Sequence, residues 1–118
     1  MSRYVYLNGA YCLKDRALMP IEDRGLLFGD AVYEVIHFEN DFFVDGAGHL
    51  DRLDRSLESL SITKPYVSHA SLWQKIRYLK GLNQLKVGFI YLQISRGIGP
   101  RNHLFPSHPR PSFLMMMK

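Results

Sequence analysis

The segment RGIGPRNHLFP, residues 96–106, places cationic side chains among glycines and prolines that turn the backbone sharply. Arg101 and His103 stand two positions apart, so in an extended loop their side chains point the same way. An arginine and a histidine on one side of a rigid loop can bind a carboxylate through charge-assisted hydrogen bonds. A solvent-exposed basic loop fits the spacing equally well, and the spacing assigns no role to Arg96.

A second group of candidate side chains lies in AVYEVIHFEN, residues 31–40, which alternates along its length. In a β-strand, Tyr33, Val35 and His37 project from the same face. Three such side chains can line a pocket that has a phenol at one end. The alternative is ordinary sheet packing, with Tyr33 at the edge of a layer. Neither face of the segment is purely polar, so we expect both faces to be at least partly covered.

A third candidate is Arg52, in the segment HLDRLDRSL of residues 49–57. Arg52 and Arg55 are three positions apart and are therefore neighbours on a helix surface. A planar guanidinium that points inward suits a phosphate group. The residues alone favour the simpler alternative, a solvated helix face on which Asp51 and Asp54 pair with the arginines.

The segment EDRGLLFGD, residues 22–30, is typical of structure rather than catalysis. Its Asp-Arg pair and two glycines predict a fixed backbone path that side-chain hydrogen bonds hold. The five histidines show no HExxH or Cys/His spacing, so no metal site is predicted. Gly97 and Gly99 form a GxG fragment, which is too weak a signal for a nucleotide-binding loop.

These candidates need elements to position them, and the pattern predicts strands and helices in separate runs. The Asn8-Gly9 pair between two β-forming segments predicts a hairpin over residues 4–15. Further strands are predicted at residues 31–40, 42–45, 86–97 and 111–117, helices at 49–62 and 68–82 with Ser68 as N-cap, and irregular structure at 16–30. Segregated strands and helices with short connections predict an α+β domain, an antiparallel β-sheet with two α-helices packed on one side.

Composition limits the class of protein. A chain of 118 residues, 47% hydrophobic and 22% charged, is the size and type of one folded domain. The formal net charge of +4 does not predict nucleic-acid binding, because the basic residues are scattered among acids. No apolar run approaches the roughly 20 residues that span a membrane. Cys12 is the only cysteine and cannot form an internal disulfide, which favours a cytoplasmic setting.

Three motifs occur in order: DRGLLFGDAVYEV at residues 23–35, HLDRLDRSL at 49–57 and YLQISRGIGPRNHLFP at 91–106. Together they resemble the N-terminal small domain of the class IV, fold-type IV pyridoxal-phosphate aminotransferases, over essentially all 118 residues. Within that family, the PRxHxFP pattern and the surroundings of Tyr33 resemble the D-amino-acid (D-alanine) aminotransferase branch. The resemblance implies the same fold class that the strand and helix pattern predicts.

The resemblance also implies a role for each candidate outside the basic loop. Arg52 would bind the phosphate of the cofactor, pyridoxal 5'-phosphate. Tyr33 would line the substrate site and help to hold the substrate carboxylate, and Val35 and His37 would line the same pocket. A lysine stands at the position of His37 in the D-amino-acid enzyme that the chain resembles, so the preference for the substrate side chain stays open.

By the same resemblance, Arg101 and His103 would form a carboxylate trap that reaches into the active site of the neighbouring subunit of a homodimer. The whole protein would then move an amino group between a D-amino acid and a 2-oxo acid. Branched-chain aminotransferases and aminodeoxychorismate lyases usually differ in this loop, and they remain alternatives within the family.

The groups that do the covalent chemistry in this family are expected outside residues 1–118. None of the lysines stands in the motif of the family's catalytic lysine, and the acidic partner of the pyridine nitrogen is missing too. Pyridoxal chemistry needs both groups, so we expect residues 1–118 to be an inactive N-terminal domain cut from a longer enzyme. The apolar end SFLMMMK, residues 112–118, agrees with that expectation. A truncated, stand-alone binding domain is the alternative outside the family.

Overall fold

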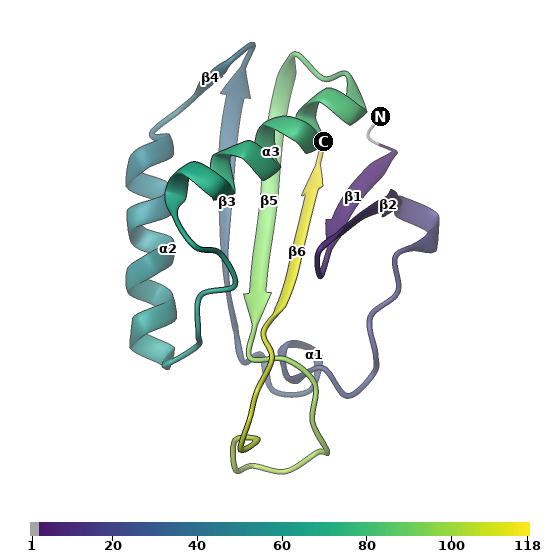
Figure 1. Ribbon diagram of the computed structural model, residues 1–118, viewed down its shortest axis with the longest axis vertical. Helices are drawn as coiled ribbons and strands as arrows, with labels where there is room; N and C mark the ends of the chain where they lie inside the picture. Colours follow the sequence, from purple (N-terminus) through teal and green to yellow (C-terminus); the bar gives the residue numbers. More distant parts are fainter. Residues whose placement is uncertain (1–2) are drawn as a thin grey trace.

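The computed structural model describes residues 3–118, and its framework is one antiparallel sheet. Its six strands are β1 (Tyr4–Leu7), β2 (Ala10–Leu13), β3 (Ala31–Glu39), β4 (Phe42–Phe43), β5 (Val87–Ser95) and β6 (Ser112–Met117). They follow the order β2-β1-β6-β5-β3-β4, and every neighbouring pair is antiparallel (Figure 1). Strands β1 and β2 form the predicted hairpin around Asn8-Gly9, and β3 pairs with β5 along its whole length.

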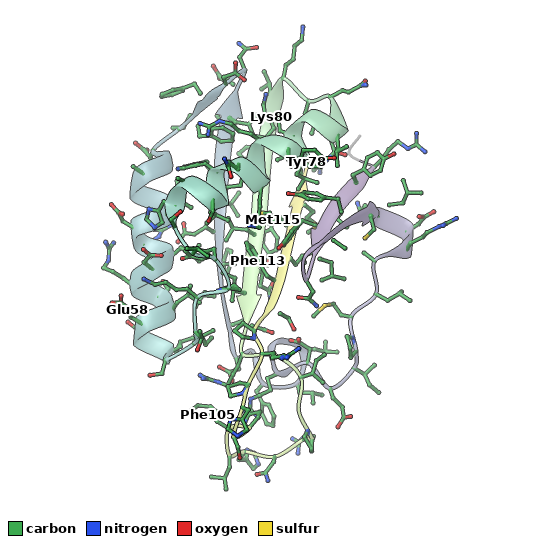
Figure 2. All side chains as sticks on the ribbon, in the orientation of Figure 1. Glu58, Tyr78, Lys80, Phe105, Phe113 and Met115 are labelled. Carbon is green, nitrogen blue, oxygen red and sulfur yellow. The ribbon has the colours of Figure 1, made fainter. Side chains whose placement is uncertain are left out.

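Two helices, α2 (Gly46–Leu60) and α3 (His69–Asn83), cover one face of the sheet (Figure 1). Their inward side chains are fully buried, namely Leu50, Leu53, Leu57, Leu72, Ile76 and Leu79. The sheet supplies the other half of the core, which includes Ile36, Phe38, Ile90, Leu92 and the labelled Phe113 and Met115 of Figure 2. Each large aliphatic side chain buried in this way stabilises the fold by about 1.5–3 kcal/mol. The predicted α+β architecture is confirmed.

The ends of the two helices have identifiable causes. The Ser68 hydroxyl accepts a hydrogen bond from the Ser71 N–H at 3.1 Å, and the Ser71 hydroxyl accepts one from the Ser68 N–H at 3.2 Å. This capping box confirms Ser68 as the N-cap of α3. Helix α2 begins three residues earlier than predicted, at Gly46. A Cβ atom at Gly46 would lie 2.8 Å from the ring of Trp73, so the close approach of the two helices requires a glycine there.

The prediction of irregular structure at residues 16–30 was partly wrong. The structure has a single 3-10 turn, η1 (Lys14–Arg16), and a short helix, α1 (Arg24–Phe28). The Asp23 carboxylate caps α1 by accepting the Gly25 N–H at 2.8 Å, and Gly29 ends it with a φ of 64°. A helix of five residues gains little from its own hydrogen bonds. Instead, α1 is held by the buried side chain of Arg24, which no periodic apolar pattern indicates.

The face of the sheet opposite the helices is much more exposed than expected. Alternate residues of β3 are buried under α2, but Tyr33 is 63% exposed and Val35 is 41% exposed. The expected cover on both faces is therefore not provided by residues 3–118. We call this side, with Tyr33, Val35, His37 and Tyr91, the open face. None of the helices in residues 3–118 has the length and apolarity that a membrane crossing requires.

Gly97, where the chain leaves β5, is expected to tolerate no side chain. Its φ is +111°, and a Cβ atom would lie 1.9 Å from the Arg110 carbonyl oxygen. We expect Gly97→Ala to lower the free energy of unfolding of the 118-residue chain by about 1–3 kcal/mol, measured by urea titration. Gly81→Ala is the control, because its Cβ would meet open space inside α3 and should stabilise by about 0.5–1 kcal/mol. Equal stabilities for the Gly97 variant and the wild type would contradict the expectation.

Candidate functional site

A buried carboxylate on β3 organises the first part of the site. Glu34 points from β3 toward α2, where its Oε2 accepts a hydrogen bond from Arg52 Nε at 2.8 Å. Its Oε1 accepts a second bond from Arg52 Nη2 at 2.8 Å and lies 2.7 Å from His49 Nδ1. His49 and Arg52 stand three positions apart on α2, which places both side chains above the same strand residue. The result is a fixed, bidentate arginine–carboxylate pair.

Electrostatics keeps this pair ionised. Burial by itself would raise the pKa of Glu34, but hydrogen bonds and positive charge from Arg52 and His49 lower that pKa overall. The hydrogen bonds and negative charge of Glu34 in turn raise the pKa of Arg52. Because Glu34 is only 3% exposed and Arg52 is largely exposed, the carboxylate acts as an internal anchor and the guanidinium faces outward.

The outward side of Arg52 borders a shallow hollow of about 300 Å³. The hollow is lined by Asp45, Gly48, His49, Arg52 and Arg55. Within residues 3–118, Arg52 Nη1 and the Arg55 guanidinium have no hydrogen-bond or ion-pair partner. The expectation that Asp51 and Asp54 pair with these arginines was wrong, because Arg52 pairs with Glu34, and Asp54 binds Tyr66 and His69 instead.

The open face carries the second part of the site. Tyr33 stacks on Tyr91, with ring centroids 5.7 Å apart, and His37 lies against Phe89 at 5.0 Å. A hollow of about 550 Å³ adjoins them and is lined by Lys14, Val35, Phe89, Tyr91, Met116, Met117 and Lys118. The structure thus brings Tyr33, Val35 and His37 to one face beside an apolar hollow, as the alternation of the segment predicts.

These two parts meet around the edge of β3. Strand β4 pairs only with Phe38 and Glu39, so the earlier part of β3 lies beside α2 without a strand on its outer side. Tyr33 is the residue directly before Glu34, the partner of Arg52, on β3, and its side chain projects to the opposite face of the sheet. A ligand that contacts both groups would therefore run from the α2 side of β3 to the open face.

The third part of the site is the loop of residues 96–111 between β5 and β6, which we call the basic loop. It extends beyond the end of the sheet (Figure 1). The Arg101 guanidinium carbon lies 5.3 Å from the centre of the Phe28 ring, and the His103 ring lies 5.6 Å from the same ring. Arg101 and His103 therefore lie against the same ring, in agreement with the prediction that their side chains point the same way. Within residues 3–118, no hydrogen bond, ion pair or ring contact joins either of them to Tyr33 or Arg52.

The base of this loop rests on two buried arginines that share one carboxylate. Asp30 Oδ2 lies 3.0 Å from Arg24 Nε and 2.7 Å from Arg96 Nε, and Asp30 Oδ1 accepts a bond from Arg96 Nη2 at 3.2 Å. The side chains of both arginines are 4% exposed. Arg24 also donates to the Asn102 carbonyl at 2.7 Å, which ties α1 to the loop. Arg96, without a role in the sequence analysis, is a structural residue.

Comparison with known proteins adds relatives of stated activity. Over 103 residues, the chain is 38% identical to the D-alanine aminotransferase of Listeria monocytogenes, an alignment that covers 86% of this chain and 35% of that protein. It is 35% identical to the enzyme of the same name from Staphylococcus aureus, over 87% of this chain and 36% of that protein. D-alanine aminotransferases are homologues of this chain. The chain spans about a third of their length, and no family model matches it.

Solved structures show the same fold at low identity. The branched-chain amino acid aminotransferase of Escherichia coli matches 100% of this chain and 40% of its own, with a TM-score of 0.91 and 18% identity. The 4-amino-4-deoxychorismate lyase of Pseudomonas aeruginosa matches 97% of this chain and 39% of its own, with a TM-score of 0.72 and 22% identity. A T.th. branched-chain amino acid aminotransferase, complexed with N-(5'-phosphopyridoxyl)-L-glutamate, matches 99% of this chain and 40% of its own, with a TM-score of 0.87 and 16% identity. The predicted fold-type IV architecture is confirmed.

Glu34, Asp30 and Phe28 are the residues of this region to which the sequence analysis gave no role, whereas Arg24 belongs to the Asp-Arg pair that was expected to hold the backbone path by side-chain hydrogen bonds, as it does. Glu34 had a usable signal, because it is the one charged residue on the buried face of its strand. In the described part of the chain, no three His, Cys, Asp or Glu side chains are grouped to hold a metal ion.

Proposed function

We propose that residues 1–118 form the N-terminal domain of a longer pyridoxal-phosphate enzyme that transfers an amino group between a D-amino acid such as D-alanine and a 2-oxo acid. The observation that carries the proposal is the 38% identity to a D-alanine aminotransferase over 103 residues. The arrangement of Arg52, the open face and the basic loop is compatible with it. The setting is cytoplasmic, and the single Cys12 agrees with a reducing compartment.

The hollow beside Arg52 suits the phosphate of the cofactor. Arg52 presents Nη1, which has no partner in residues 3–118, while Glu34 holds the rest of its guanidinium in place. Arg55 adds a second positive charge at the rim of the same hollow. When bound, pyridoxal phosphate supplies an electron sink for bond breaking at the substrate α-carbon. Arg52 is the residue of this chain that would hold it.

The open face and the basic loop would orient the substrate. Tyr33 would hydrogen-bond the substrate carboxylate, while Val35 and His37 would face its side chain. Arg101 and His103 would bind the carboxylate as a trap. As the resemblance to the D-amino-acid aminotransferases implies, we assign their action to the active site of the neighbouring subunit of a homodimer.

The lysine and the acidic group that complete the chemistry would belong to the part of the enzyme outside this chain. The 118 residues alone should therefore not catalyse transamination, whereas the full reading frame should. Full activity of the isolated chain, or a natural frame that stops at Lys118, would favour the stand-alone binding domain instead. Assays of the full-length protein with D-alanine, L-leucine and aminodeoxychorismate separate the proposed activity from those of the branched-chain aminotransferases and the lyases.

Removing the trap arginine is the direct test of the substrate site. In the full-length enzyme, Arg101→Ala should raise the KM for D-alanine about tenfold, the loss expected for one charge-assisted hydrogen bond. The measurement is steady-state transamination over a range of D-alanine concentrations. Arg110→Ala is the matched control, since Arg110 is an exposed arginine of the same loop. A KM that Arg101→Ala leaves unchanged would remove the trap from the proposal.

A further inference from the structure

The ring of Phe28 lies at the point where the short helix α1 meets the basic loop. Phe28 is the last residue of α1 and is half-buried. Three positively charged or titratable side chains surround its ring: the guanidinium carbons of Arg24 and Arg101 lie 4.5 and 5.3 Å from its centre, and the His103 ring lies 5.6 Å away. A cation at such distances is attracted by the electrons of the aromatic face.

Arg101 and His103 both contact this ring. Both residues are exposed, and within residues 3–118 neither forms a hydrogen bond or an ion pair. A long arginine side chain without contacts samples many rotamers, and ordering it on binding costs free energy. Contact with a fixed ring removes part of that cost before a carboxylate arrives.

The Phe28 ring is itself in contact with a buried arginine, Arg24. Arg24 lies between two aromatic rings, 4.5 Å from the centre of Phe28 and 5.3 Å from that of Phe105. Arg96 covers Phe105 at 3.7 Å, and Asp30 binds both buried arginines. Figure 2 labels Phe105 on the loop below the sheet.

From end to end, cations and rings alternate in the order Arg101, Phe28, Arg24, Phe105, Arg96. At one end of this column, Arg24 and Arg96 are buried and share the Asp30 carboxylate, while Arg101 at the other end is exposed. These contacts link Phe28 to the buried arginines, so they restrict the movement of the ring against which Arg101 and His103 lie.

We propose that Phe28 is the positioning residue of the carboxylate trap: its ring is the platform that pre-orients Arg101 and His103, and the column behind it keeps the platform in place. The inference rests on the proposed function and assigns a residue outside the trap to substrate affinity. Phe28 acts through its two neighbours and need not touch the substrate.

The test compares Phe28→Leu, which keeps an apolar side chain without an aromatic face, with Phe28→Tyr, which keeps the ring. In the full-length enzyme, Phe28→Leu should raise the KM for D-alanine about 3- to 30-fold with little change in kcat, the range that one cation–π contact provides. Phe28→Tyr should stay close to wild type. Phe42→Leu is the matched control, because Phe42 is an exposed phenylalanine on β4, away from the loop.

A second background separates positioning from general damage to the fold. In an enzyme that already carries Arg101→Ala and His103→Ala, Phe28→Leu should leave the KM unchanged, because the side chains through which it acts are gone. The proposal is overturned by an undiminished effect of Phe28→Leu in that background, or by an unchanged KM in the wild-type background.

A measurement without catalysis keeps this inference distinct from the proposed function. Trypsin cleavage of the native full-length protein after Arg101 reports how well the loop is held. Phe28→Leu should accelerate that cleavage severalfold, and Phe42→Leu should not. If the wild-type protein shows no transamination with D-alanine, the proposed function fails. Faster cleavage would then still support the platform, and an unchanged cleavage rate would overturn it.

Discussion

Asp30→Asn is expected to lower the free energy of unfolding by about 3–5 kcal/mol, because it leaves two buried guanidinium groups without their anion. Asp30 bonds to both Arg24 and Arg96, each of which is 4% exposed. Arg96 keeps its bonds to the carbonyls of Leu60 and Ser61, at 2.6 and 3.1 Å, but these carry no full charge. The measurement is urea unfolding of the 118-residue chain, followed by the fluorescence of its one tryptophan.

The pH dependence of the difference in unfolding free energy between wild type and Asp30→Asn identifies the cause of that difference. Burial would raise the pKa of Asp30, but hydrogen bonds and charge from Arg96 and Arg24 lower that pKa overall. A carboxylate with a lowered pKa stabilises the fold above its unfolded pKa, about 3.9 for aspartate, and loses this contribution as the pH falls through the folded pKa. The gap between wild type and Asp30→Asn should therefore be constant near neutrality and shrink below about pH 4.

The matched control for this prediction is Asp41→Asn. Asp41 is a fully exposed aspartate whose one ion pair, to Lys80, is 3.8 Å long, so its loss should give no measurable change. A gap for Asp30→Asn that persists unchanged at low pH would mean that packing, rather than charge, accounts for the loss.

The fold was largely predictable because its core obeys short-range periodicity. Leucines and one isoleucine, three and four residues apart, mark the buried stripes of α2 and α3, and Ser68 marks a helix start from local chemistry alone. Helix α1 was missed for the opposite reason. It has no apolar stripe, and the side chain that holds it, Arg24, finds its partner in the Asn102 carbonyl, 78 residues along the chain.

The parts of the site that depend on spacing within one strand could be predicted from the sequence. The ion pairs between residues of different elements could not. The alternation of β3 places Tyr33, Val35 and His37 together without knowledge of the rest of the fold. The partner of Arg52 is a different matter, because Glu34 lies 18 residues away on another element. A carboxylate on a buried strand face does demand a cation, but the rotation of α2 over the sheet decides which arginine supplies it.

Arg52→Ala is expected to have the largest effect on cofactor binding. In the apo form of the full-length protein, the Kd for pyridoxal phosphate should rise about 10- to 150-fold, because a charge-assisted contact to the phosphate is lost. Titration of the apoprotein with the cofactor, followed by absorbance, measures it. Arg77→Ala is the control, since Arg77 is an exposed arginine of α3 that lies over the rings of Phe43 and Trp73.

Glu34→Gln tests whether the orientation of the Arg52 side chain, as well as its charge, contributes to cofactor affinity. The variant keeps the guanidinium but removes the anion that holds Arg52 Nε and Nη2, so the arginine must be ordered when the phosphate binds. We expect the Kd to rise about 2- to 10-fold, the cost of immobilising one long side chain. In the Arg52→Ala background, Glu34→Gln should add nothing, because Glu34 acts only through Arg52. A double variant that binds still more weakly would place Glu34 or its partner His49 in direct contact with the cofactor, and wild-type affinity in Arg52→Ala would remove Arg52 from the cofactor site.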